Sequence, residues 1–219
     1  MRSRSAASPP ARHPAPLFAA SARAPGLDMA CAMILSIAGI AAGALAGGAS
    51  PAAAQAKLYH TREHALALAF ATGEELRPVP LELSAALVET ISERAKVEAE
   101  FKHTECFQAL AGGEVKAYAC IDNMLGHERY ITYLLRIEHP SGQIAFLEIM
   151  QHREASGNLT HYPHFLRRFK GKTVADQVWN NRDIPLITAA TESCNALTGG
   201  ARKLLRLYDL YLKRLPPQG

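Results

Sequence analysis

The sequence predicts an α+β domain in which an antiparallel sheet is flanked by N-terminal and C-terminal helices. Three observations indicate this class: helical patterns stand at both ends of residues 57–219, strand patterns fill the middle, and short glycine-containing turns join the strands. Strands joined by short turns pair antiparallel, and segregated helices and strands are typical of α+β folds. No internal repeat or low-complexity linker divides these residues, so we expect a single domain.

Two short helices are expected before the sheet. Thr61 precedes an Ala- and Leu-rich amphipathic run that ends at Phe70, and Ser84 precedes a second apolar pattern. Hydroxyl side chains are favoured immediately before a helix, where they accept a hydrogen bond from a free backbone N–H. Residues 77–80, Arg-Pro-Val-Pro, are expected to form a loop between the two helices.

Four strands are expected in the middle of the chain, at residues 97–109, 115–121, 130–137 and 143–150. Gly112-Gly113 separates the first two, and His-Pro-Ser-Gly at 139–142 separates the last two. Cys106 and Cys120 flank the first turn, so they either bridge across a hairpin or stay as two buried thiols. In either case Cys194 is left over.

The last third becomes helical again. Residues 162–171 carry Pro163 near the first helical position and stop at glycine. A final helix is expected from Ser193 to Lys213, because its leucines keep a helical spacing. Gly199 and Gly200 each weaken that helix by about 1 kcal/mol relative to alanine, unless close packing requires them.

Residues 1–56 have the pattern of a secretory leader. A basic region is followed by an apolar run and by small residues at Ala54 and Ala56, which predicts cleavage after Ala56 and a periplasmic bacterial protein. The alternative is an uncleaved membrane anchor at residues 29–49, since the apolar run approaches the roughly 20 residues of a membrane span. The leader holds four arginines and one aspartate, so without it the net charge falls from +4 to +1. Such a balance argues against nucleic-acid binding.

The segment from Asp183 to Cys194 is the strongest candidate for a site. Small residues allow a ligand to approach the backbone, and Thr188, Thr191 and Ser193 offer hydroxyls just before a helix. The unpaired N–H groups and positive dipole end of a helix favour an anion there. The simpler interpretation is an ordinary helix-capping loop, in which Thr and Ser serve the helix alone.

The run Thr188-Ala189-Ala190-Thr191-Glu192-Ser193 resembles the Ser/Thr-Gly-Ala-Thr-x-Ser motif of the FMN-binding domain family. That family includes flavin subunits of Rnf-type and sodium-pumping NADH:quinone reductase complexes and small exported FMN-binding proteins. Softer similarities, among them residues 142–149 and 165–172, extend over most of residues 57–213. The resemblance implies an FMN-binding-like fold with FMN as cofactor.

By the same resemblance, Thr191 is the candidate for a phosphoester bond to FMN made by a separate flavin transferase, with noncovalent binding as the alternative. Thr188 and Ser193 are then expected to position the phosphate, and the small Ala189 and Ala190 to let it approach the backbone. Two positions depart from the motif. Ala189 replaces a glycine, which strains the turn if that position has a positive φ. Pro185 replaces an acidic residue, and Asp183, further upstream, is the nearest acidic candidate.

Other side chains have two interpretations each. Glu154 matches a family position near the flavin, or is a solvated turn carboxylate. His152, His161 and His164 either serve a metal or cofactor or lie on the surface, and their spacing fits no metal template. Phe165, Phe169 and Trp179 either stack on the flavin or, for the two phenylalanines, belong to the core.

The function implied is electron transfer: FMN changes redox state while the protein binds and orients it. The expected partner is a membrane-bound redox protein with haem or iron–sulfur centres. No nucleophile–base pair or acid pair stands out, so hydrolysis is not indicated. The alternatives are a cofactor-free periplasmic binding or scaffold protein and an assembly factor for a metalloenzyme.

Overall fold

The computed structural model of the chain describes residues 56–153, 158–161 and 163–218. The predicted leader, except for its last residue, lies outside these ranges, and so does Glu154. Cleavage after Ala56 and the alternative anchor at 29–49 therefore stay predictions. Within the described ranges, no helix combines the length and the apolar character that a membrane span requires.

Within the described residues, six strands form one antiparallel sheet in the order β1-β6-β5-β4-β3-β2. Strands β2 to β6 follow one another across the sheet in chain order, and β1 adds to the outer edge of β6. The strands are β1 (Lys57–Leu58), β2 (Glu75–Val79), β3 (Glu105–Ala111), β4 (Glu114–Leu125), β5 (Tyr130–Glu138) and β6 (Ile144–His152). The antiparallel α+β class is confirmed.

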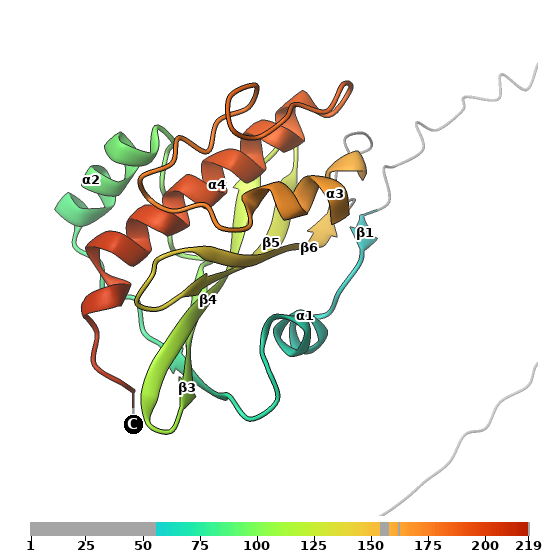
Figure 1. Cartoon of the computed structure of the whole chain (residues 1–219). Coiled ribbons are helices and arrows are strands. Elements are labelled where there is room, and N and C mark those ends of the chain that lie inside the picture. The colour runs from blue at the N-terminus through green and yellow to red at the C-terminus, as the bar shows by residue number, and fades with distance from the viewer. Residues whose placement is uncertain (1–55, 154–157, 162, 219) are drawn as a thin grey trace, which may run out of the picture. The chain divides into compact units, whose positions relative to one another are not determined.

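Helices stand before and after the strands of the central meander. They are α1 (Arg62–Ala69), α2 (Ala85–Ala95), α3 (Pro163–Leu166) and α4 (Thr191–Leu210), with the short 3-10 turns η1 (Asn158–His161), η2 (Arg167–Phe169) and η3 (Leu212–Arg214). Figure 1 shows α4 lying across one face of the sheet beside α2, while α1 lies on the other face.

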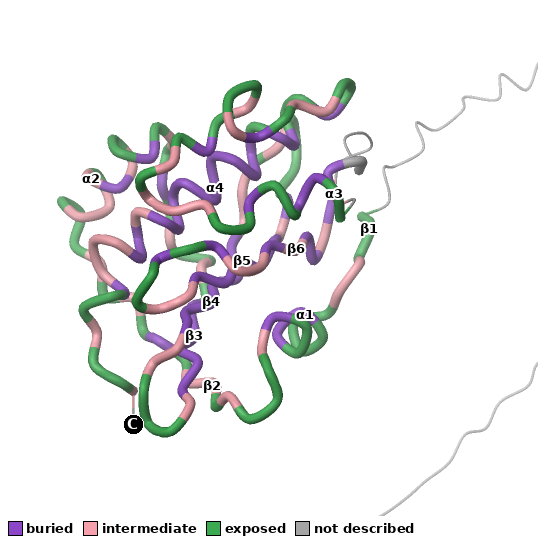
Figure 2. Tube along the Cα trace, in the orientation of Figure 1, coloured by how far each residue is buried: buried purple, intermediate pink, exposed green. Residues whose placement is uncertain are grey.

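Each face of the sheet has its own core. Successive residues of a strand point to opposite faces, so Tyr133 and Leu135 pack toward α4, whereas Leu134 packs toward α1. The core on the α4 side is the larger one and includes most of the inner face of α4. The buried segments concentrate along β3 to β6 and α4 (Figure 2).

The predicted starts of the first two helices are confirmed. Thr61 Oγ1 accepts a hydrogen bond from the backbone N–H of His64 at 3.3 Å, and Ser84 Oγ accepts one from Leu87 at the same distance. Each bond satisfies one of the N–H groups that the first helical turn leaves unpaired. The local sequence is therefore sufficient to place both helices.

The Gly112-Gly113 turn joins β3 and β4 with both glycines at positive φ, +63° and +79°. Cys106 pairs with Cys120 in the register of this hairpin, and the two form a disulfide on the α4 side of the sheet. Of the two alternatives that the sequence leaves open, the bridge is the one present. Cys194 is a free, buried thiol.

Two expectations before and within the sheet are wrong. Residues 77–79 of the expected loop belong to the edge strand β2, Glu75–Val79, in which Pro78 lies opposite Phe107, and only Pro80 follows the strand. Proline is tolerated at an edge, where one side of the strand needs no backbone donor. The first long strand begins at Glu105 instead of residue 97, since a turn with a hydrogen bond from the Thr104 N–H to the Phe101 carbonyl precedes it.

The last third needs smaller corrections. The segment expected as one helix is α3 followed by the 3-10 turn η2, with Pro163 at the predicted first position and Gly171 at φ +81°. Phe165 and Phe169 are core residues, packed edge to face with their ring centres 5.6 Å apart. The final helix begins at Thr191, two residues before the predicted Ser193, and ends at Leu210.

Gly199 and Gly200 are required by packing. A Cβ atom at Gly199 would lie 2.8 Å from Val97 Cγ1, and one at Gly200 would lie 2.7 Å from Met124 Cγ and against the Tyr133 hydroxyl. Real Cβ atoms do not approach neighbours so closely, so these glycines let the backbone of α4 pack closely against Val97 and Met124. The close approach outweighs their low helix propensity.

Candidate functional site

The entry to α4 is a tight turn that ends in the first residue of the helix. Ala189 is left-handed, with φ +66°, and Ala190 follows as the N-cap residue. The Ala190 N–H donates to the Ile187 carbonyl at 3.1 Å, and its own carbonyl accepts from the Cys194 N–H at 2.9 Å. Ala190 is buried, whereas Thr191, the first helical residue, is exposed. Thr191 is therefore accessible from outside.

Ala189 occupies the position where the FMN-binding motif has glycine. The sequence raised the question of whether this position has a positive φ, and it does. A left-handed conformation costs a residue with a Cβ atom about 1–2 kcal/mol, and glycine avoids that cost. The turn thus keeps the backbone conformation that suits a glycine while it carries an alanine.

The start of α4 differs from that of an ordinary capped helix. The N-cap residue of a helix usually supplies a side-chain oxygen to the first-turn N–H groups. Ala190 has no such oxygen, and among the described residues no side chain caps α4. The simpler interpretation, in which Thr and Ser cap the helix, is therefore wrong. The N-cap residue therefore leaves the first-turn N–H groups without a side-chain acceptor of its own.

The three hydroxyls of the segment do not all face the same way. Thr188 and Thr191 are exposed, whereas Ser193 is buried. Ser193 Oγ lies 3.3 Å from Nε2 of His152, a buried residue at the end of β6. The structure thus brings Thr188, Ala189 and Thr191 together at the surface. Ser193 connects the first turn of α4 to the sheet.

The three histidines have different environments. His152 is only 1% exposed, so the surface interpretation is wrong for it. His161 is partly buried and stacks on Tyr59, with ring centres 4.6 Å apart, and His164 is exposed. Among the described residues, no three His, Cys, Asp or Glu side chains are grouped in a way that holds a metal ion.

Asp183 stabilises the loop before α4. Its carboxylate accepts the backbone N–H groups of Val178 and Trp179, both at 2.8 Å, and its Oδ2 lies 3.3 Å from Lys172 Nζ. Burial raises the pKa of Asp183, but these hydrogen bonds outweigh burial and lower the pKa below its usual range. The carboxylate thus binds backbone N–H groups within the turn at residues 178–183, and these hydrogen bonds fix the position of Trp179.

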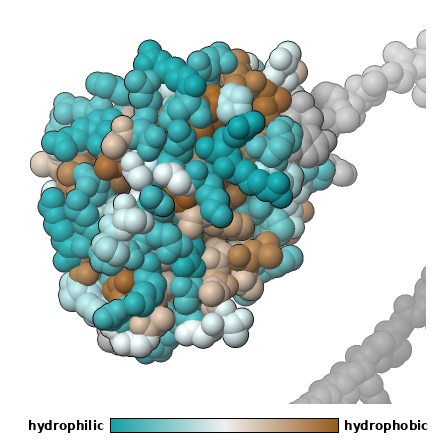
Figure 3. All heavy atoms as spheres, viewed as in Figure 1, coloured by the Kyte–Doolittle hydropathy of each residue, from teal (hydrophilic) through white to brown (hydrophobic). Residues whose placement is uncertain are grey.

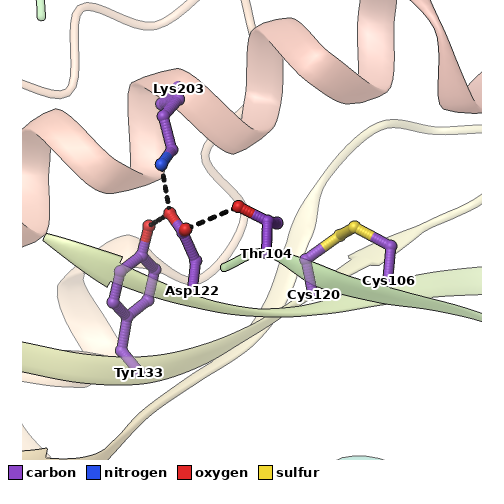
Figure 4. The surroundings of a disulfide bond; sticks show 6 residues. All are labelled: Thr104, Cys106, Cys120, Asp122, Tyr133 and Lys203. Carbon is purple, nitrogen blue, oxygen red and sulfur yellow. Dashed lines mark hydrogen bonds and ion pairs between the residues drawn. A yellow bond between two sulfur atoms is a disulfide. The ribbon is translucent and has the colours of Figure 1, made fainter. Parts of the chain in front are cut away.

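A second polar cluster lies under α4, and sequence reasoning missed it. Lys203 Nζ is 2.6 Å from Asp122 Oδ2, and both side chains are 2% exposed. Tyr133 and Thr104 donate their hydroxyls to the same carboxylate, each at 2.8 Å (Figure 4). Lys203 also donates to the Glu100 carbonyl at 3.0 Å. Burial, with the negative charge of Asp122, raises the pKa of Tyr133 well above its usual value.

This cluster is internally satisfied. The Asp122 carboxylate receives one ammonium and two hydroxyl donors, which is what a buried charge needs in order to be tolerated. It lies beside a pocket of about 300 Å³ that also includes His103 and Tyr130. A sequence signal existed: Asp122 interrupts an apolar strand, and Lys203 stands on the buried side of the final helix. Their pairing depends on the tertiary fold.

Three pockets are described in the structure, and none of them is lined by residues 188–193. One is the pocket beside Asp122, a second lies over β6 and α3, and the third lies between α2, α4 and residues 173–179. In the view of Figure 3 most of the surface is hydrophilic, with apolar areas between the polar ones. In the turn itself, Thr188, Ala189 and Thr191 are exposed and Ala190 is buried.

Comparison of the sequence with known proteins adds no family to this description. No protein-family model matches the chain. No curated protein is significantly similar to it.

Proposed function

We propose that this chain is an exported FMN-binding protein that carries electrons, with the flavin phosphate bound at the Thr188–Ser193 segment. The observation that supports this most directly is the exposed Thr191 at the first position of α4, after a left-handed Ala189 and an N-cap residue without a side-chain acceptor. This backbone leaves a helix N-terminus open to a phosphate. The resemblance of residues 188–193 to the FMN-binding motif indicates that the bound phosphate is that of FMN.

The residues of the turn have separable roles in this proposal. The exposed Ala189 allows close approach, the buried Ala190 holds the turn beneath it, and the exposed Thr188 donates a hydroxyl to the phosphate. Thr191 is the attachment residue if the flavin is covalent: a flavin transferase joins its Oγ to the flavin phosphorus of a flavin dinucleotide donor. The phosphoanhydride bond of the donor breaks, and the nucleoside monophosphate leaves with the hydroxyl proton. His152 fixes the buried Ser193 and with it the first turn of α4.

Bound FMN supplies the redox chemistry, and this chain's residues hold and orient it. The Cys106–Cys120 disulfide supports export, because disulfides persist in oxidising compartments such as the periplasm. We expect the electron partner to be a membrane-bound redox protein with haem or iron–sulfur centres. Glu154 is proposed to lie near the flavin, and Asp183 contributes by holding the preceding loop.

The test is co-expression of the full chain with a flavin transferase, followed by absorption spectroscopy and mass spectrometry of the purified protein. We expect the visible absorption of oxidised flavin and an FMN-sized added mass on the peptide that contains Thr191. Thr191→Ala should remove the added mass, whereas Thr72→Ala, which changes an exposed threonine in the turn between α1 and β2, should keep it. Added mass that survives Thr191→Ala would show that attachment is elsewhere.

Noncovalent binding is tested separately by titrating FMN against the same protein without the transferase. Flavin that binds saturably and is released on denaturation supports the noncovalent form. A chain that takes up no flavin in either experiment would refute the proposal.

A cofactor-free periplasmic binding protein is the second candidate. The observation that favours it is the position of the three described pockets, all of them away from residues 188–193. The flavin experiments above separate the two candidates, because a colourless protein after co-expression with the transferase supports only this one.

A further inference from the structure

A basic cleft lies between the end of α2, the middle of α4 and the loop before α4. It has a volume of about 310 Å³, and its lining includes four cationic side chains, Arg94, Lys96, Arg202 and Arg206, against one carboxylate, Asp176. Asp176 is already used, since it accepts the Thr173 N–H at 2.8 Å and lies 3.5 Å from Lys172. The cleft therefore has a net positive charge.

Arg202 is the central cation of this cleft. It is 8% exposed, and within the described part of the chain no carboxylate forms an ion pair with it. Its Nε donates to the Ala95 carbonyl at 2.7 Å and its Nη1 to the Val178 carbonyl at 2.8 Å. Neutral carbonyls satisfy these donors but do not neutralise the charge. Burial accordingly lowers the pKa of Arg202 to about 10, and Asp183 offsets this only in part.

Trp179 covers one side of the same guanidinium. Its ring centre lies 3.6 Å from the Arg202 Cζ, and the indole remains 38% exposed. A cation–π contact at this distance restricts the movement of the guanidinium. No described residue accepts a hydrogen bond from Arg202 Nη2. A fixed guanidinium with donors left over is the usual basis of oxyanion recognition.

The loop that supplies Trp179 is held in a strained conformation. Val178 has φ +51°, which is an outlier for a β-branched residue and costs about 1–3 kcal/mol. The Asp183 carboxylate maintains it by accepting the N–H groups of Val178 and Trp179. The strain places the Val178 carbonyl and the indole against Arg202, and such strain concentrates at ligand sites.

We propose that this cleft is a binding site for a small phosphate-bearing anion. The anion accepts from the Arg202 guanidinium, and Arg94, Lys96 and Arg206 surround it. Arg94 and Arg206 form no ion pair with the described residues, so their charges are available. The cleft is separate from the flavin site, because Arg202 lies 11 residues after Thr191 on α4, or about 16 Å along the helix.

Trp179 makes the test direct, since it is the single tryptophan of the chain. Inorganic phosphate is titrated into the full-length protein, and Trp179 fluorescence is followed against sodium chloride at matched ionic strength. Isothermal titration calorimetry of the same samples is the second readout. We expect a saturable signal with phosphate only. No saturable binding in either measurement overturns the proposal.

Arginine variants test whether the anion binds in this cleft. Arg94→Gln combined with Arg206→Gln should weaken phosphate binding at least tenfold. Arg167→Gln combined with Arg168→Gln, which removes two exposed arginines of η2, is the matched control and should leave it unchanged. Equal affinity in the first double variant and the wild type overturns the proposal.

Thr191→Ala distinguishes this site from the proposed flavin site. It should leave the phosphate titration unchanged even where it removes FMN attachment. Loss of phosphate binding in Thr191→Ala would assign the anion to the start of α4 and overturn this inference, without any consequence for the flavin proposal.

Discussion

Replacing Lys203 by methionine tests the buried polar cluster under α4. Lys203 and Asp122 are each 2% exposed, and their charged atoms are 2.6 Å apart. Methionine keeps most of the volume and removes the charge. Asp122 then remains in the interior without its cation, although Tyr133 and Thr104 still donate hydrogen bonds to it (Figure 4).

The expected loss of stability is large. Two unit charges at 2.6 Å attract each other by about 6 kcal/mol at an effective dielectric constant of about 20. Desolvation of both groups opposes this gain, and removal of one partner from a buried pair typically costs about 3–5 kcal/mol. The two remaining hydroxyl donors place Lys203→Met at the lower end, about 3 kcal/mol. A domain has only about 5–15 kcal/mol of total stability.

Urea denaturation followed by circular dichroism measures the change in unfolding free energy. Lys116→Met is the matched control: its ion pair with Glu114 is also 2.6 Å long, but the two side chains are 44% and 76% exposed. We expect this control to change the unfolding free energy little, because exposed ion pairs are screened by water. Asp122→Asn combined with Lys203→Met should recover part of the loss, because no unpaired charge stays buried. Equal effects of Lys203→Met and Lys116→Met would refute the reasoning.

Three further predictions concern the turn, the helix contact and an ion pair. Ala189→Gly should stabilise the fold by about 0.5–1 kcal/mol in urea denaturation, because relief of the left-handed alanine exceeds the entropy cost of glycine; a loss of stability would contradict this. Gly200→Ala should lower stability by about 1–3 kcal/mol, because the new Cβ would lie 2.7 Å from Met124 Cγ. The loss should be seen as a lower Tm. An unchanged Tm would show that α4 shifts away from Met124 without cost. Hydrogen bonds from Arg136 lower the pKa of Glu74, so Glu74 stabilises the fold above its unfolded pKa, and the stabilisation is lost as the pH falls through the folded pKa. The stability difference between wild type and Glu74→Gln should therefore disappear on acidification, and a difference constant with pH would exclude this linkage.

The sequence predicted those parts of the fold that depend on neighbouring residues. Thr61 and Ser84 mark helix starts because a capping hydroxyl contacts an N–H three residues ahead. Gly112-Gly113 marks a hairpin because its backbone requires positive φ at both positions. The proline-containing strand β2 was missed because its pairing with β3 is a long-range interaction that local propensity opposes.

The candidate site likewise has parts that the sequence predicted and parts that it did not. The small, hydroxyl-bearing entry to α4 was found from the sequence, since a helix start and its side chains are local features. The sequence did not predict that Ser193 points inward to His152, because β6 and α4 come together only in the folded chain. The same holds for the basic cleft, whose charges come from α2, α4 and the loop before α4.

By itself, the sequence determined the α+β class, most element starts and the motif at residues 188–193. Only the tertiary structure decided which charges are buried, as with Lys203 against Asp122 and Arg202 under Trp179. The physical reason is that burial and ion pairing depend on groups far apart in the chain. Helix capping and turn formation depend on residues within a few positions of each other.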